Sequence, residues 1–127
     1  MKTVILAGGL GTRLSEYTKT IPKPMVKIGP YPILIHIISH YLKYGFSEFI
    51  LAVGYKNHVI KKYFKNFKKN GVPFDAKIKK QSCKINIVFT GHNTLTGGRL
   101  KRVKKYLTRN KDFLFTYGDG VSNVNLK

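Results

Sequence analysis

Hydrophobic residues along this chain are grouped into short runs of two kinds. Residues 2–7 (KTVILA), 48–53 (EFILAV) and 112–117 (DFLFTY) are nearly continuous apolar runs, which are typical of strands covered on both faces of a sheet. Residues 84–89 (KINIVF) alternate between polar and apolar positions, and that period also predicts a strand. The sequence therefore predicts four strands, most of them buried.

Three segments between these strands have apolar residues at helical spacing. Residues 33–44 are followed by Gly45, where a C-terminal glycine cap belongs. Residues 57–69 combine an apolar inner face with a lysine-rich outer face, and residues 98–107 are expected to form a third helix. The expected inner face of the second helix consists of Val59, Ile60, Tyr63, Phe64 and Phe67, and that of the third of Leu100, Val103 and Leu107.

Strands and helices alternate along the whole chain, with loop-like sequence at residues 8–24 and no clear pattern over most of residues 72–95. This alternation favours the α/β class, in the form of a Rossmann-like α/β/α sandwich with a mostly parallel sheet. The length of 127 residues suits one domain. In a doubly wound sheet the first strand is expected to be central, with the strand of residues 112–117 beside it at an open edge.

The composition adds a strong positive charge, because 24 Lys and Arg residues face only five acids, for a formal charge of +19. Such a chain attracts polyanions. No pattern of a known nucleic-acid-binding module is present, so a solvated lysine-rich surface is favoured over a nucleic-acid-binding domain.

Several classes of protein are not indicated. No run of 18 or more apolar residues is present, so no membrane span is expected, and no signal peptide is evident. The single cysteine, Cys83, allows neither an internal disulfide nor a cysteine-rich metal site. A cytoplasmic protein is expected.

Ligands of open α/β sheets bind beyond the carboxyl ends of the strands. Here the sequences in that position are LAGGLGTRL (6–14), GYK (54–56) and GDG (118–120). The P-loop pattern does not occur, and the dinucleotide fingerprint lacks its third glycine, since Leu14 occupies that position. The glycine-rich loop is therefore expected to hold phosphate or nucleotide in another way.

LAGGLGTRL, followed by P-K-P-M at residues 22–25, resembles the sugar-1-phosphate nucleotidyltransferase family. TGGRLKRV (96–103) and FLFTYGDGV (113–121) resemble the branch of that family that transfers a cytidylyl group from CTP to glucose 1-phosphate. The likeness covers nearly the whole chain. It implies CTP and glucose 1-phosphate as substrates and Mg²⁺ as cofactor, and it admits a homo-oligomer.

The resemblance also implies roles for individual residues. Arg13, Lys23 and Asp119 would be catalytic, and Asp119 would bind Mg²⁺, because this ion prefers carboxylate and phosphate oxygens. The nucleotide would be bound by Leu6, Ala7, Gly8, Gly9, Leu10, Gly11, Thr12, Arg13, Lys23, Thr96, Gly97 and Arg99.

Members of this family are about twice as long, and their second half supplies another metal-binding aspartate and most of the sugar pocket. The chain is therefore expected to be an N-terminal part or a truncated form, with weak nucleotide binding and very low turnover. Three alternatives stay open at this point. They are an inactive or regulatory nucleotide-binding remnant, a transferase for another nucleotide or sugar phosphate, and a basic nucleic-acid-binding domain.

Overall fold

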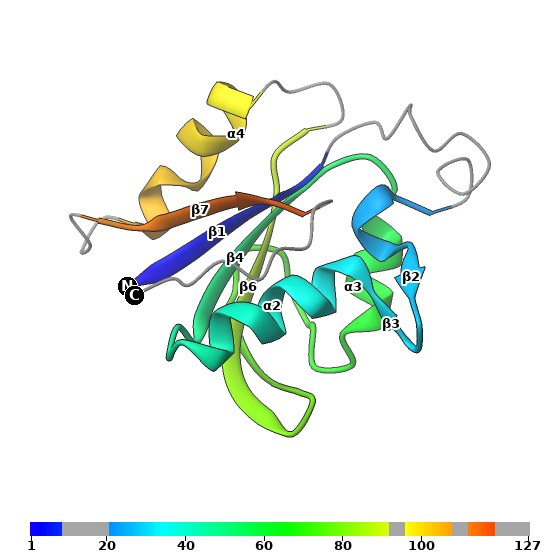
Figure 1. Ribbon diagram of the computed structural model, residues 1–127. Coiled ribbons are helices and arrows are strands. Elements are labelled where there is room, and N and C mark those ends of the chain that lie inside the picture. The colour runs from blue at the N-terminus through cyan, green and yellow to red at the C-terminus, as the bar shows by residue number, and fades with distance from the viewer. Residues whose placement is uncertain (9–20, 92–95, 108–111, 119–127) are drawn as a thin grey trace.

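The computed structural model describes residues 1–8, 21–91, 96–107 and 112–118. A five-stranded sheet with the order β5-β6-β4-β1-β7 forms its centre (Figure 1). Neighbouring strands are parallel except β5 and β6, which are antiparallel. The α/β class with a mostly parallel sheet is confirmed. The strands are β1 (Lys2–Ala7), β4 (Glu48–Val53), β5 (Phe74–Ile78), β6 (Gln81–Phe89) and β7 (Leu114–Tyr117).

β1 lies inside the sheet, between β4 and β7, as predicted. Val4 illustrates the position, because it pairs with Ile50 on one side and Phe115 on the other. Val4 and Ile5 are completely buried, and their branched side chains suit a strand that is packed on both faces. The continuous apolar run is thus explained by burial above and below the sheet.

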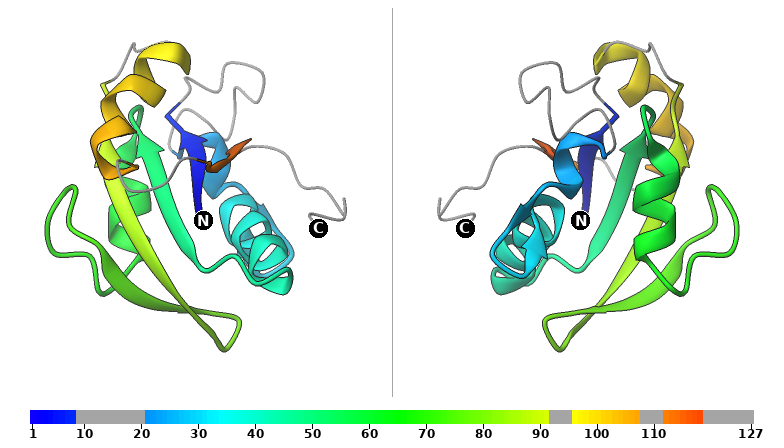
Figure 2. Two further views of the ribbon diagram at one scale, coloured as in Figure 1. Left: turned by 90° about the vertical axis from the view of Figure 1, so that its left-hand side faces the viewer. Right: turned by 90° about the vertical axis from the view of Figure 1, so that its right-hand side faces the viewer.

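Helices cover both faces of this sheet (Figure 2). Successive residues of a strand point to opposite faces, so Ile5 and Leu51 join the core under α2 (Ile33–Lys43) and α3 (Asn57–Tyr63). Val4 and Ile50 join a second core with Val103 of α4 (Thr96–Val103). The predicted α/β/α layering is therefore present.

The first helix, α2, ends as its sequence predicts. Its C-cap is Tyr44, and Gly45 adopts φ +88°, a conformation that side chains other than glycine rarely accept. The Gly45 N–H donates to the Leu42 carbonyl at 3.0 Å, which satisfies one of the last carbonyls of the helix.

No helix in the described part of the chain combines the length and apolar character needed to cross a membrane.

The second helix is shorter than predicted, because α3 ends at Tyr63 and not near residue 69. Phe64 turns to an extended conformation (φ −92°, ψ 105°) and is buried, with its ring centroid 5.8 Å from that of Phe74. Asn66 donates its side-chain amide to a carbonyl of β5 at 2.7 Å. Aromatic burial and an asparagine that bonds to backbone outside the helix override the helical pattern here.

The hairpin of β5 with β6 was predicted only in part, since residues 84–89 of β6 were expected to form a strand and β5 was not. Its turn uses Lys79 (φ 48°) and Lys80 (φ 72°), without the glycine or asparagine that marks most such turns. The Lys79 ammonium lies 4.8 Å from the centroid of the Tyr31 ring and 3.4 Å from Nδ1 of His36. These contacts favour a turn that local preference alone would not predict.

The third helix is divided into α4 and a 3-10 turn, η2 (Lys104–Tyr106). Val103 and Leu107 are buried and Leu100 packs against them, as predicted. The following strand, β7, pairs only with β1 among the described strands. It is therefore the edge strand that the sequence predicted.

Two residues of α3 that share the predicted inner face give a direct test of this fold. Ile60 is fully buried, whereas Tyr63 is 39% exposed. Ile60→Ala should lower the free energy of unfolding by about 2–5 kcal/mol, and Tyr63→Ala by less than about 1.5 kcal/mol. Urea unfolding of both variants measures the difference. Equal losses would contradict the difference in burial between the two side chains.

Candidate active site at the carboxyl ends of the strands

Three of the predicted segments meet where β1 and β7 end. The Gly118 N–H donates to the Leu6 carbonyl at 2.8 Å. A Cβ placed on Gly118 would lie 2.9 Å from that carbonyl oxygen and 3.2 Å from Cγ of Pro24. The end of β1, the P-K-P-M segment and the beginning of G-D-G are therefore in direct contact.

The P-K-P-M segment forms a short 3-10 turn, η1 (Lys23–Met25), within the stretch that was predicted to be loop. The Met25 N–H donates to the Pro22 carbonyl at 2.9 Å, and the Val26 N–H to the Lys23 carbonyl at 3.1 Å. Pro24 and Met25 are buried, and the prolines restrict the backbone on both sides of Lys23. The half-buried Lys23 is thus carried on a turn with little freedom.

Gly8 and Gly54, at the ends of β1 and β4, leave room for a side chain that reaches them from α4. A Cβ on Gly8 would overlap the guanidinium of Arg99, and one on Gly54 would lie 2.6 Å from Nη1 of the same group. The second position would also overlap the carbonyl oxygen of Gly91. Glycine is therefore required at both positions by close packing inside the protein.

Arg99 connects the end of β1 with the residues that follow β6. Its Nη2 donates to the Gly8 carbonyl at 2.8 Å, and its Nη1 donates to Oγ1 of Thr90 at 2.8 Å and to the Gly91 carbonyl at 3.1 Å. Only 4% of the residue is exposed. Arg99 therefore lies inside the candidate site, under the backbone where β1 leads into the glycine-rich loop.

The surroundings of Arg99 are unusual for a buried cation. Burial, and to a lesser degree the charge of Arg102, lower the pKa of Arg99, but an arginine stays protonated at neutral pH. Within the described part of the chain its acceptors are carbonyls and a hydroxyl, all neutral. The candidate site thus contains a fixed positive charge.

The structure describes some of the predicted nucleotide-binding residues. Leu6 and Ala7 are buried in β1, Lys23 lies on η1, and Gly97 is exposed in the first turn of α4. Thr96 begins that helix. Six predicted residues lie outside the described part: Gly9, Leu10, Gly11, Thr12, Arg13 and Asp119.

Sequence reasoning did not find Thr90. This residue follows β6, is fully buried, and donates its hydroxyl to the Val53 carbonyl at 3.0 Å while accepting from Arg99. The available signal was a hydroxyl residue before Gly91, directly after a predicted strand. Its role depends on a neighbour from another strand, so no local pattern identifies it.

The predicted Mg²⁺ site depends on Asp119. Among the residues that the structure describes, no group of three or more His, Cys, Asp and Glu side chains could hold a metal ion. Asp119 directly follows Gly118, whose backbone is held against β1. A carboxylate that follows this position has the donor chemistry that Mg²⁺ prefers, so the sequence there fits the ion.

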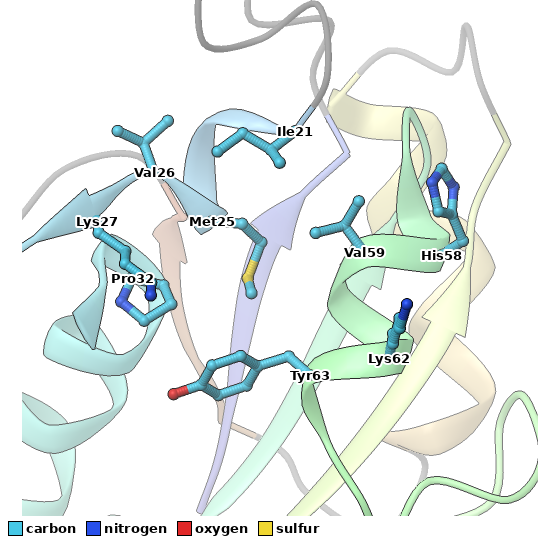
Figure 3. Close-up of a pocket in the computed structure, with 9 residues that line it drawn as sticks. All are labelled: Ile21, Met25, Val26, Lys27, Pro32, His58, Val59, Lys62 and Tyr63. Atoms are coloured by element: carbon cyan, nitrogen blue, oxygen red, sulfur yellow. The ribbon is translucent and has the colours of Figure 1, made fainter. Parts of the chain in front are cut away.

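A separate open hollow of about 860 Å³ lies on the side of η1 that faces α3. Figure 3 shows Met25 and Tyr63 pointing into it from opposite sides. Its lining is largely apolar, with cationic groups from two lysines. Those predicted site residues that the structure describes do not line it. It is lined by Ile21, Met25, Val26, Lys27, Pro32, His58, Val59, Lys62 and Tyr63.

Comparison with known protein families gives a match over almost the whole chain. Residues 2–127 match the family described as nucleotidyl transferase. The chain belongs to the nucleotidyl transferase family. This membership agrees with the meeting of the glycine-rich strand end, the P-K-P-M turn and the G-D-G segment at one edge of the sheet.

Curated relatives in this family include two kinds of transferase. The glucose-1-phosphate cytidylyltransferase of Salmonella typhimurium is 47% identical over 137 residues, which cover 100% of this chain and 53% of the relative. The D-glycero-alpha-D-manno-heptose 1-phosphate guanylyltransferase of Campylobacter jejuni is 37% identical and covers 99% and 51%. The chain thus spans about half the length of these relatives.

Solved structures of other proteins share the fold. HddC from Yersinia pseudotuberculosis has a TM-score of 0.72 at 30% identity, covering 97% of this chain and 49% of that one. The UTP-bound UGPase from Acinetobacter baumannii has a TM-score of 0.75 at 21% identity, covering 93% and 45%. The second likeness supports the fold alone.

The contact of Gly118 with Leu6 and Pro24 can be tested by adding one methyl group. Gly118→Ala should lower the free energy of unfolding by about 1–3 kcal/mol, because the new Cβ is too close to a backbone oxygen. Gly97→Ala is the matched control, since its Cβ meets nothing within 4 Å, and it should be neutral or stabilise by up to about 1 kcal/mol. Thermal unfolding measures both, and an unchanged Gly118→Ala variant would contradict the contact.

Proposed function

We propose that this chain is the nucleotide-binding half of an enzyme that transfers a cytidylyl group from CTP to glucose 1-phosphate. The observation that carries the proposal is the contact of Gly118, directly after β7, with the end of β1 and with Pro24 of the P-K-P-M turn. The cytidylyltransferase relatives, at 46–47% identity over essentially the whole chain, favour CTP and glucose 1-phosphate as its substrates.

In the proposed reaction, a phosphate oxygen of glucose 1-phosphate attacks the α-phosphorus of CTP. The bond from that phosphorus to the oxygen that bridges to the β-phosphate breaks, so CDP-glucose forms and pyrophosphate leaves. No proton transfer is required, because the attacking oxygen is already ionised at neutral pH. The protein's contribution is therefore to hold two anions together and to stabilise the charge.

Lys23 is suited to this task, because its backbone is held by flanking prolines and by the buried Met25. A lysine ammonium on a rigid turn offsets phosphate charge without large reorganisation. Mg²⁺, when bound through Asp119, would screen the phosphates and favour departure of pyrophosphate. Arg13 is proposed to bind the departing phosphates.

The choice of base and sugar is the finer part of the proposal. The identity to cytidylyltransferases exceeds the 37% identity to the heptose guanylyltransferase, and this difference supports CTP over GTP. A cytoplasmic location and a homo-oligomeric state remain predictions from the sequence.

A second candidate function is nucleotide binding without turnover. The observation that favours it is that the chain spans only about half the length of its relatives. Weak binding with very low turnover is therefore expected for the 127 residues alone.

Thermal unfolding with CTP, UTP, dTTP or GTP, each with Mg²⁺, measures the first part of this proposal. CTP should give the largest rise in melting temperature, because a ligand that binds only the folded state stabilises it. Pyrophosphate release with CTP and glucose 1-phosphate measures the second part. Binding without release would support the second candidate, whereas no shift with any nucleotide would refute both.

Lys23 provides the sharpest test of the proposed site. Lys23→Met keeps most of the side-chain length and removes the charge, so the Kd for CTP should rise by about tenfold or more, corresponding to about 1.4 kcal/mol. Lys27→Met, on the exposed β2 (Lys27–Ile28), removes the same charge and should change the Kd by less than about twofold. Isothermal titration calorimetry compares them, and equal effects would show that only net charge matters.

A further inference from the structure

Arg99 has contacts that a ligand-binding side chain does not need. It is 4% exposed, and both of its terminal nitrogens donate to protein acceptors. One acceptor, the Gly8 carbonyl, ends β1, while Oγ1 of Thr90 and the Gly91 carbonyl follow β6. A guanidinium in this position is directed into the protein, away from solvent.

Thr90 also connects the end of β4 with the guanidinium of Arg99. The Thr90 hydroxyl accepts from Arg99 and donates to the Val53 carbonyl at the end of β4. The Thr90 N–H donates to the same carbonyl at 2.8 Å. Arg102, in the last turn of α4, donates to the Thr90 carbonyl at 2.6 Å, which binds this helix to Thr90 a second time.

The glycines at the strand ends fit the guanidinium closely. Gly8 and Gly54 are the positions at which a Cβ would meet Arg99. A cation buried this tightly is stable only where hydrogen bonds replace its lost hydration. The strand ends therefore cannot separate without exposing or breaking those bonds.

We infer that Arg99 is a positioning residue: it binds the ends of β1, β4 and β6 to α4 and sets the direction in which the chain leaves Gly8. This assignment differs from the direct contact with nucleotide that the family resemblance implied for Arg99. Its effect on nucleotide binding rests on the proposed function, whereas its effect on stability does not.

The first experiment measures the effect of Arg99→Ala on thermal stability. The matched control is Lys101→Ala, on the exposed face of the same helix. Arg99→Ala should lower the melting temperature by about 10 °C, since it leaves several buried acceptors unpaired. Lys101→Ala should change it by less than about 2 °C. Arg99→Lys is measured in parallel, because it keeps the charge but cannot span the acceptors, and it should recover only part of the loss.

A double-mutant cycle tests the close packing without any ligand. Gly8→Ala should lower the melting temperature strongly when Arg99 is present, because the new Cβ would overlap the guanidinium. In the Arg99→Ala background the same change should cost less than half as much, since the space is then vacant. Equal costs in the two backgrounds, or an Arg99→Ala variant as stable as the native protein, would overturn the inference.

The nucleotide arm separates positioning from direct contact. If Arg99 acts through the backbone of Gly8, Arg99→Lys should raise the Kd values for CTP, CDP, CMP and UTP by one common factor. That factor should be about tenfold, which corresponds to 1.4 kcal/mol. A loss that grows with the number of phosphates, or that differs between CTP and UTP, would mean that Arg99 touches the nucleotide. If the native protein binds no nucleotide, the proposed function fails, and the melting temperatures and the cycle still decide the role of Arg99.

Discussion

Parallel pairing of β1 with both β4 and β7 is the constraint on which the candidate site depends. Parallel strands end at the same edge of a sheet. The register places Ala7 beside Val53 and Leu6 beside Tyr117, so Gly54 is level with Gly8, and Gly118 is level with Ala7, one residue earlier. Segments far apart in the chain therefore meet, and Gly118 contacts both the end of β1 and Pro24 of the P-K-P-M turn.

The strand ends must also be held together where the regular pairing of the sheet stops. Regular backbone pairing ends at Ala7 and Val53, and beyond that point carbonyl groups need other donors. Arg99 supplies donors from α4, at a cost in desolvation that hydrogen bonds to several neutral acceptors offset. The charge of this group also raises the electrostatic potential where the glycine-rich loop begins.

The sequence predicted those parts of the fold whose signal is local. β1 and β4 have the predicted limits, and Gly45 ends α2 as expected. The end of α3, the strand β5 and the turn that joins it to β6 were not predicted, because burial of Phe64 and the contacts of Lys79 come from distant residues. The fold class was therefore accessible from periodicity, whereas element limits set by tertiary packing were not.

In the site, too, the features with a local sequence signal were predicted and those set by distant contacts were not. The prolines on both sides of Lys23 act locally, and the segment predicted to be loop forms a short 3-10 turn there. Thr90 and the contacts of Arg99 were not foreseen, because the guanidinium bonds to Gly8, which is 91 residues away in sequence. Asp119 and Arg13 lie outside the described part of the chain, so their predicted roles rest on the sequence alone.

A glycine in this site can leave room for a ligand or for another side chain of the protein, and the sequence alone does not distinguish the two. The G-G-x-G pattern predicts room for a ligand on the outer side of the loop, whereas Gly8 and Gly54 also make room for a guanidinium on the inner side. A frame built from backbone and an internal cation does not depend on the identity of a base. In the proposed function, selection of the base would therefore depend on side chains around this frame.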